Sequence, residues 1–274
     1  MQNYKMIVLD LDGTLTNSKK EITPRTKAAL MRIQAEGVKV VLASGRPTGG
    51  IMPLAEELRL AEYGGYILAF NGGKIVDCAT GGVVYEQQLE ETIVPYLHAV
   101  AKEAGLSILT YQDATIVATN KADEYVQLEG FINKMPVEQY DDFLNQIVYP
   151  LNKCLIVGNP TPLYDLEQRI VAEQGERLSA YRSADFFLEC VPLGVDKAQS
   201  IDRLIGTLGI DRSEVVACGD GHNDLSMIEY AGLGVAMDNA VEAVKAVADD
   251  VTLSNEEDGV AHLIERLWVA SSGN

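Results

Sequence analysis

Short apolar runs alternate with longer amphipathic segments at both ends of the chain, and this alternation is the feature that most constrains the fold. In the first part of the chain, residues 7–9, 38–43 and 66–70 are predicted strands, with helices between them. The run from Val38 to Ala43 is continuously apolar, which suits a parallel sheet covered by helices on both faces. The order of these elements therefore predicts an α/β fold with a parallel sheet.

The same rhythm returns near the end of the chain, after a stretch of different texture. We predict a helix over 197–208, a strand over 215–218, a helix from Asp224, a strand over 234–237 and a last helix near 259–268. The intervening residues mix longer helices with alternating strands such as 107–110 and 115–118, and they hold most of the tyrosines. The sequence therefore predicts two domains: a Rossmann-like core of residues 1–83 and 190–274, and an inserted α/β cap of residues 84–189.

The charge balance limits the partners that the chain can have. It contains 40 acidic and 22 basic residues, a net charge of −18. This excess argues against general binding to nucleic acid or to anionic membranes. No apolar run approaches the ~18 residues of a spanning helix, and the run in residues 1–9 is too short for a signal peptide. We therefore predict a cytoplasmic protein with no nucleic-acid or membrane partner.

Polar side chains follow the predicted core strands at the points where these strands end. In an open α/β sheet, ligands bind in the crevice outside the carboxyl ends of the strands. We therefore expect one site beneath the inserted domain, built from strand-end residues: Asp10, Ser44, Asn71 and Asp220.

The opening strand runs into two closely spaced carboxylates. Alternate residues of an extended chain face the same way, so the side chains of Asp10 and Asp12 are expected to lie close together and to repel each other. A cation in the site, or a proton retained by one carboxyl, would resolve this repulsion. With Asp220 and Asp224 they form a set of hard oxygen ligands that suits Mg²⁺.

Positively charged and anion-binding groups accompany these carboxylates. Ser44, Gly45 and Arg46 precede Pro47 at a predicted helix start, where backbone N–H groups form a ready anion site. Lys197 adds a compact positive charge at the start of another helix. A metal, an anion site and a lysine around a strand end together point to phosphoryl transfer.

Four segments, in this order, resemble the motifs of the haloacid dehalogenase superfamily of phosphatases. They are residues 10–14 (Asp-Leu-Asp-Gly-Thr), 44–46 (Ser-Gly-Arg), Lys197 and 219–224 (Gly-Asp-Gly-His-Asn-Asp). The text around them, at 71–72, 227–232, 234–240 and 255–260, is similar to the Cof-type branch and especially to the YidA-like sugar phosphatases. The resemblance implies a Rossmann-like core with a cap of the C2 type.

The resemblance also implies chemical roles for the two aspartates of the opening stretch. Asp10 would be the nucleophile that forms an aspartyl-phosphate. Asp12 would protonate the leaving alcohol and then activate water. Mg²⁺ would be held by the Asp10 carboxylate, the Asp12 backbone carbonyl and Asp220. Asn223 and Asp224 would support these ligands or the substrate side, and a direct bond from Asp224 to the metal stays open.

The remaining motif residues would bind the substrate. Ser44 and Lys197 would bind the transferring phosphoryl oxygens and so take part in catalysis. The groups expected beside the rest of the substrate are Gly45, Arg46, Asn71 and Asn223.

The predicted function is Mg²⁺-dependent hydrolysis of small phosphomonoesters, above all sugar phosphates, so the partners are small phosphorylated metabolites. Two alternatives stay open. A phosphosugar mutase would use the same aspartate but return the phosphoryl group to a sugar. A non-catalytic sensor of phosphorylated metabolites would bind such ligands with Mg²⁺, although it would have no need of a nucleophile with an acid beside it.

Overall fold

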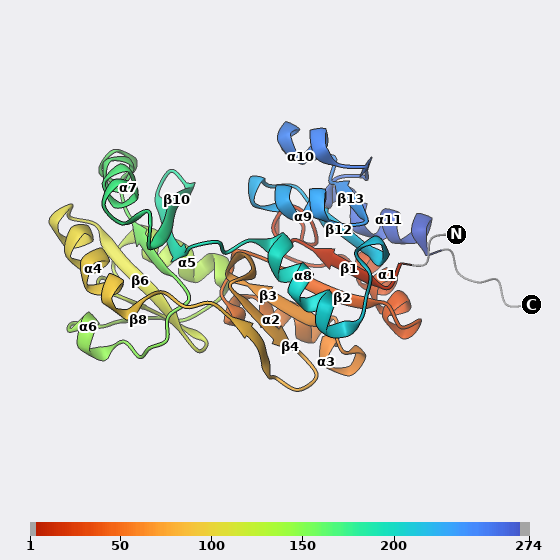
Figure 1. Cartoon of the computed structure of the whole chain (residues 1–274), viewed down its shortest axis with the longest axis horizontal. Helices are drawn as coiled ribbons and strands as arrows, with labels where there is room; N and C mark the ends of the chain where they lie inside the picture. The colour runs from red at the N-terminus through yellow and green to blue at the C-terminus, as the bar shows by residue number, and fades with distance from the viewer. Residues whose placement is uncertain (1–3, 269–274) are drawn as a thin grey trace, which may run out of the picture. The chain divides into compact units, whose positions relative to one another are not determined.

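The computed structural model describes residues 4–268 and divides into two compact units (Figure 1). The first unit comprises Met1–Gly45, Ile51–Tyr85 and Asp196–Asn274, and the second comprises Arg46–Gly50 and Glu86–Val195. The predicted outer limits of the core, residues 1 and 274, lie outside the described residues. Each unit contains its own sheet, so the predicted α/β fold with a mostly parallel core sheet and an inserted second sheet is confirmed.

The first unit is built on an eight-stranded sheet with the order β14-β13-β12-β1-β2-β3-β4-β5. Its strands are β1 (Met6–Leu9), β2 (Lys39–Ala43), β3 (Tyr66–Ala69), β4 (Lys74–Asp77), β5 (Val83–Glu86), β12 (Val215–Gly219), β13 (Leu233–Ala236) and β14 (Asp250–Val251). From β14 to β3 the neighbouring strands pair in parallel, whereas β4 pairs antiparallel with β3. All four residues of β1 are fully buried, as expected for the centre of a sheet covered on both faces.

Helices lie between the parallel strands along the chain, and one more helix follows the last strand. They are α1 (Pro24–Ala35), α2 (Thr48–Glu57), α3 (Leu60–Tyr63), α8 (Lys197–Leu208), α9 (Leu225–Tyr230), α10 (Glu242–Val247) and α11 (Gly259–Leu267). Short 3₁₀ turns lie at η1 (Phe70–Gly72), η3 (Arg212–Glu214), η4 (His222–Asp224) and η5 (Asn255–Glu257). The start of α1 follows from its sequence, because Thr23 accepts a hydrogen bond from the Thr26 N–H and Pro24 occupies the first turn, where no N–H is needed.

The second unit contains a six-stranded sheet with the order β10-β11-β9-β6-β7-β8. Its elements are η2 (Glu91–Ile93), α4 (Val94–Glu103), β6 (Ser107–Gln112), β7 (Thr115–Ala118), α5 (Glu124–Asn133), β8 (Val137–Gln139), α6 (Phe143–Gln146), β9 (Cys154–Val157), α7 (Pro160–Gln174), β10 (Leu178–Ala184) and β11 (Phe187–Pro192). Neighbouring residues of β6 face opposite sides, and Ile108 and Leu109 therefore pack into two different hydrophobic clusters.

By its residue contacts, the long segment of the second unit is Glu86–Val195. The sequence predicts a cap of residues 84–189, so the two sets of limits differ at the start and at the end of the segment. The second difference has a simple cause, since β11 pairs antiparallel with both β9 and β10 and is thus a strand of the second sheet throughout. Among residues 4–268, no helix is both long enough and apolar enough to cross a membrane. The cytoplasmic location stays a prediction.

Candidate active site

The parallel register of the core sheet brings three motif residues to one edge. Leu9, the last residue of β1, lies opposite Leu42 of β2 and Cys218 of β12. The residues that follow these strands, Asp10, Ser44 and Asp220, therefore end at the same side of the sheet, as the sequence predicts. The Asp10 N–H donates to the Cys218 carbonyl at 3.0 Å, which extends the pairing of β1 and β12 up to the first carboxylate.

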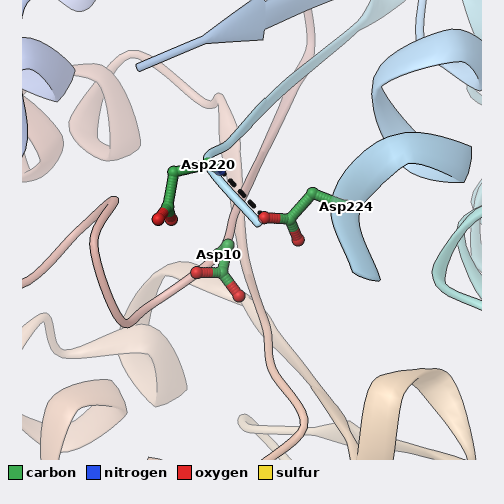
Figure 2. Close-up of side chains that lie close together, drawn as sticks. All are labelled: Asp10, Asp220 and Asp224. Carbon is green, nitrogen blue, oxygen red and sulfur yellow. Dashed lines mark hydrogen bonds between the residues drawn. The ribbon is translucent and has the colours of Figure 1, made fainter. Parts of the chain in front are cut away.

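Three carboxylates converge at this edge: Asp10, Asp220 and Asp224. One oxygen from each lies within 4.8 Å of the others, and Figure 2 shows the side chains gathered around a common point. The Asp224 carboxylate is oriented by its own loop, because its Oδ2 accepts hydrogen bonds from the N–H groups of Asp220 and Gly221, both at 2.9 Å. This acidic triad is a donor set that could hold a metal ion.

Lys197 lies against the triad. Its Nζ donates to Oδ1 of Asp10 at 2.8 Å, to Oδ1 of Asp224 at 2.6 Å and to the Ala43 carbonyl at 3.0 Å. The Lys197 side chain is completely buried, which an ammonium group tolerates only when it is paired. The lysine therefore offsets part of the triad's negative charge and fixes the direction of the Asp10 carboxylate.

The triad carries more negative charge than Lys197 balances. Burial, followed by the charge of Asp224, raises the pKa of Asp10 to about 8, although Lys197 acts in the opposite direction. Burial likewise raises the pKa of Asp220 to about 6, against the effect of a hydrogen bond from Thr14. Burial lowers the pKa of Lys197, but Asp10 and Asp224 outweigh it and the net shift is upward. A divalent cation would relieve this excess charge, so the residues present fit a bound metal ion.

Asp12 lies on the loop that leaves β1, with about a third of its side chain exposed (34%). Its Oδ1 accepts a hydrogen bond from Nζ of Lys20 at 2.7 Å. Gly13 has a φ of +87°, and a Cβ at this position would lie 2.3 Å from Oδ2 of Asp220. Only glycine therefore allows the chain to turn away from the strand so close to that carboxylate.

Asn71 and Asn223 meet at the ends of two different strands. Nδ2 of Asn223 donates to Oδ1 of Asn71 at 3.0 Å, and the Asn71 N–H donates to the Ser44 carbonyl at 2.8 Å. A Cβ on Gly45 would lie 3.2 Å from the Asn71 amide, so the glycine lets the two segments approach. The structure thus brings together four of the groups expected near the substrate.

Arg46 is placed differently. It belongs by its contacts to the second unit, where Nη1 donates to the Gly50 carbonyl at 3.4 Å. The cause lies in the two glycines that follow: a Cβ on Gly49 would lie 3.3 Å from the Ala114 Cα, and one on Gly50 would lie 2.6 Å from Oδ1 of Asn133. The role of Arg46 at the substrate stays a prediction.

Sequence reasoning did not find all of the side chains that touch the candidate site. Oγ1 of Thr14 donates a hydrogen bond to Oδ1 of Asp220 at 2.8 Å. The sequence marks Thr14 only as a member of the first motif and predicts no contact for it. No sequence pattern indicates a role for Lys20 in the site. Its approach to Asp12 depends on a reversal of the chain at Asn17–Lys20, where Lys20 takes a left-handed φ of 60°.

Comparison with known proteins agrees with this geometry. The family model of the haloacid dehalogenase-like hydrolases matches residues 7–264. YxeH of Bacillus subtilis, to which phosphatase activity is ascribed, is 35% identical over 270 residues, which cover 97% of this chain and 99% of YxeH.

Solved structures show the same fold over almost all of the chain. The crystal structure of a haloacid dehalogenase-like hydrolase from Bacteroides thetaiotaomicron has a TM-score of 0.95 and 52% identity, and covers 97% of this chain and 100% of that one. BT4131, described as a sugar phosphatase of subclass IIB, has a TM-score of 0.78 and 25% identity, with 96% and 98% covered. The chain therefore belongs to the haloacid dehalogenase-like hydrolase family, and its enzyme class within that family is phosphatase.

Proposed function

We propose that the protein is a Mg²⁺-dependent phosphatase that hydrolyses small phosphomonoesters, sugar phosphates above all, through an aspartyl-phosphate on Asp10. The observation that carries this proposal is the position of Asp10: a buried carboxylate at a strand end, held by Lys197 and facing Asp220 and Asp224. A nucleophilic carboxylate needs a fixed direction of attack and nearby positive charge for the phosphoryl group. Lys197 supports the first requirement, and Lys197 together with the acidic triad, which would hold a metal ion, supports the second.

The donor set favours a hard cation such as Mg²⁺ over zinc or copper, because it offers oxygen atoms only. We assign Asp10, Asp220 and the Asp12 backbone carbonyl as the residues that would hold it. Asp224 completes the acidic triad, and its two oxygens are engaged by Lys197 and by two backbone N–H groups. Bound Mg²⁺ would supply positive charge that neutralises the transferring phosphoryl group.

The residues of the chain then divide the reaction into two steps. In the first, the Asp10 carboxylate attacks phosphorus, the bond to the leaving oxygen breaks, and Asp12 gives that oxygen a proton. In the second, Asp12 takes a proton from a water molecule that attacks phosphorus, which releases inorganic phosphate and restores the Asp10 carboxylate. Ser44 and Lys197 would bind the phosphoryl oxygens, Lys197 in exchange for one of the three hydrogen bonds that its ammonium group makes to Asp10, Asp224 and the Ala43 carbonyl.

The sugar-phosphate assignment is supported by the subclass IIB sugar phosphatase BT4131, whose fold this chain shares. Gly45, Asn71 and Asn223 lie together near the strand ends and present amide groups that suit hydroxyl groups of a sugar. We assign the substrate side of the site to these three residues, and a role for Arg46 at the substrate stays a prediction from the sequence. We also propose that, within its family, the protein belongs with the YidA-like sugar phosphatases.

A panel of phosphorylated metabolites, assayed for released phosphate and for isomerised product, tests the proposed function. Hydrolysis predicts inorganic phosphate in equal amount to the dephosphorylated product. A phosphosugar isomer without free phosphate would identify a mutase. Binding of a panel member without any conversion would identify a sensor, and either result would overturn the proposal.

Metal binding should control both activity and stability. Chelation with EDTA should abolish turnover and added Mg²⁺ should restore it. Because the pKa values of Asp10 and Asp220 are raised, the metal-free folded state holds protons that the unfolded chain releases. Its stability should therefore fall as pH rises through about 6 and about 8.

Protons should compete with Mg²⁺ for the same carboxylates. Mg²⁺ should thus raise the Tm more at about pH 8.5 than at about pH 5.5, as thermal unfolding with EDTA or Mg²⁺ can measure. Full activity in thoroughly chelated protein, or a Tm that Mg²⁺ does not change at either pH, would contradict the assigned metal site.

A further inference from the structure

Two asparagines outside the proposed chemistry reach the loop that carries Asp12. Asn239 lies after β13, and Asn255 lies in η5. Nδ2 of Asn239 donates to the Gly13 carbonyl at 2.8 Å, and Nδ2 of Asn255 donates to the Thr16 carbonyl at 2.9 Å. Both residues thus bind backbone oxygens of the short segment directly after the proposed acid and base.

The direction of the Asn239 amide is fixed by its neighbour. Its Oδ1 accepts a hydrogen bond from the Asn255 N–H at 3.0 Å, so the Nδ2 group faces Gly13. The segment around Asn239 is itself tied to β12, because the Met237 N–H donates to the Gly219 carbonyl at 3.1 Å and the Val241 N–H donates to the Asp220 carbonyl at 3.0 Å. Asn239 therefore connects the loop after β1 to the strand end that carries Asp220.

This connection restrains the backbone at Gly13. Glycine has no Cβ, so it adopts its φ of +87° without steric strain, and its backbone is less restricted than that of any other residue type. Rotation of the Gly13 peptide would swing the Asp12 backbone, and a shift of about 1 Å in a catalytic group can cost about 10²-fold in rate. Hydrogen bonds to the Gly13 and Thr16 carbonyls oppose this rotation from two sides.

We propose that Asn239 and Asn255 are positioning residues that hold the Asp12 side chain in place for proton transfer. This inference rests on the role of Asp12 in the proposed function. It predicts that loss of either asparagine's donor impairs the step that needs the Asp12 proton more than any other step.

The variant Asn239→Asp removes the donor alone. It keeps an oxygen that accepts from the Asn255 N–H, but it places an acceptor against the Gly13 carbonyl. On an alkyl phosphate, whose leaving group needs a proton, kcat/KM should fall by about 10-fold to 100-fold. On an activated aryl phosphate, whose leaving group needs little protonation, kcat/KM measured at saturating Mg²⁺ should change by less than about 3-fold, because this ratio reports the first phosphoryl transfer.

Three matched variants complete the test. Asn17→Asp adds the same charge to the loop that carries Asp12 but keeps the hydrogen bonds of this side chain, since both use Oδ1 as an acceptor. It should leave kcat/KM unchanged for both substrates. Asn255→Ala should repeat the selective loss, and Asn239→Ala replaces Asn239→Asp if thermal unfolding shows that the latter is not folded.

The decisive comparison uses Asp12→Asn. If Asn239 acts through Asp12, the double variant should be no slower on the alkyl phosphate than Asp12→Asn alone. Equal losses on both substrates, no loss, or fully additive losses would overturn the inference while leaving the proposed function intact. If Asp12→Asn itself shows no dependence on the leaving group, the assigned role of Asp12 fails, and the inference fails with it.

Discussion

Replacing Asp10 with asparagine should reduce turnover of every phosphomonoester by on the order of 10⁶-fold, the loss typical of a missing covalent nucleophile. The amide has nearly the same shape as the carboxylate, but it is a poor nucleophile and cannot form an acyl phosphate. Phosphate release from an alkyl and an aryl substrate, each measured with Mg²⁺ present, checks this result.

The matched control is Asp165→Asn, which removes the same charge from an exposed position on α7. It should retain full activity, and thermal unfolding should show that both variants are folded. An Asp10→Asn protein that keeps more than about one per cent of the activity would show that another group attacks phosphorus, since loss of the nucleophile removes far more than this.

Replacing Lys197 with methionine should both inactivate and destabilise the protein. The ammonium group is completely buried and contacts Asp10 and Asp224 at 2.8 and 2.6 Å, so its removal leaves two buried carboxylates without their counter-charge. Breaking a buried ion pair in this way costs about 3 to 5 kcal/mol in the free energy of unfolding. Urea denaturation of metal-free protein at about pH 9.5, above the raised pKa of Asp10, measures this cost.

Lys245→Met is the matched control, because Lys245 forms only a surface pair with Glu242 at 3.8 Å. Such pairs contribute about 0 to 1 kcal/mol. The loss in the free energy of unfolding that Lys197→Met causes should be smaller at about pH 5, where the raised pKa of Asp10 leaves that carboxyl protonated. Equal stability of the two variants at both pH values would contradict the assigned charge balance.

The core of the fold was predictable because its physical causes are local. Continuous apolar runs mark buried parallel strands, and the parallel register then brings every strand end to one edge. Asp10, Ser44 and Asp220 could therefore be placed together from the sequence alone. Lys197 could also be placed, since it begins the helix α8 (Lys197–Leu208) that the amphipathic pattern predicts.

The contacts around Asp12 could not be predicted in this way. Asn239 meets Gly13 and Asn255 meets Thr16 across more than two hundred residues, through single side-chain hydrogen bonds between loops. Loop contacts of this kind leave no periodic pattern in a sequence. Both segments belong to the stretches that resemble the Cof-type branch, but only the three-dimensional structure shows what they touch.

Arg46 shows that a prediction from neighbouring residues in the sequence also has limits. Its place beside Ser44 in the sequence suggested one shared anion site, yet the close approach of Gly50 to Asn133 groups Arg46–Gly50 with the second unit. Adjacency along the chain therefore does not decide which unit a side chain contacts.

The most direct test of the whole account is intact-mass spectrometry of rapidly quenched Asp12→Asn protein supplied with an activated aryl phosphate and Mg²⁺. Loss of the Asp12 proton-transfer group should slow the hydrolysis of the aspartyl-phosphate by about 10²-fold to 10⁴-fold, while the good leaving group lets the first step proceed. The account predicts one added phosphoryl group, mapped to Asp10 and absent from Asp10→Asn. Labelling of both variants, or labelling that maps to another residue, would contradict it.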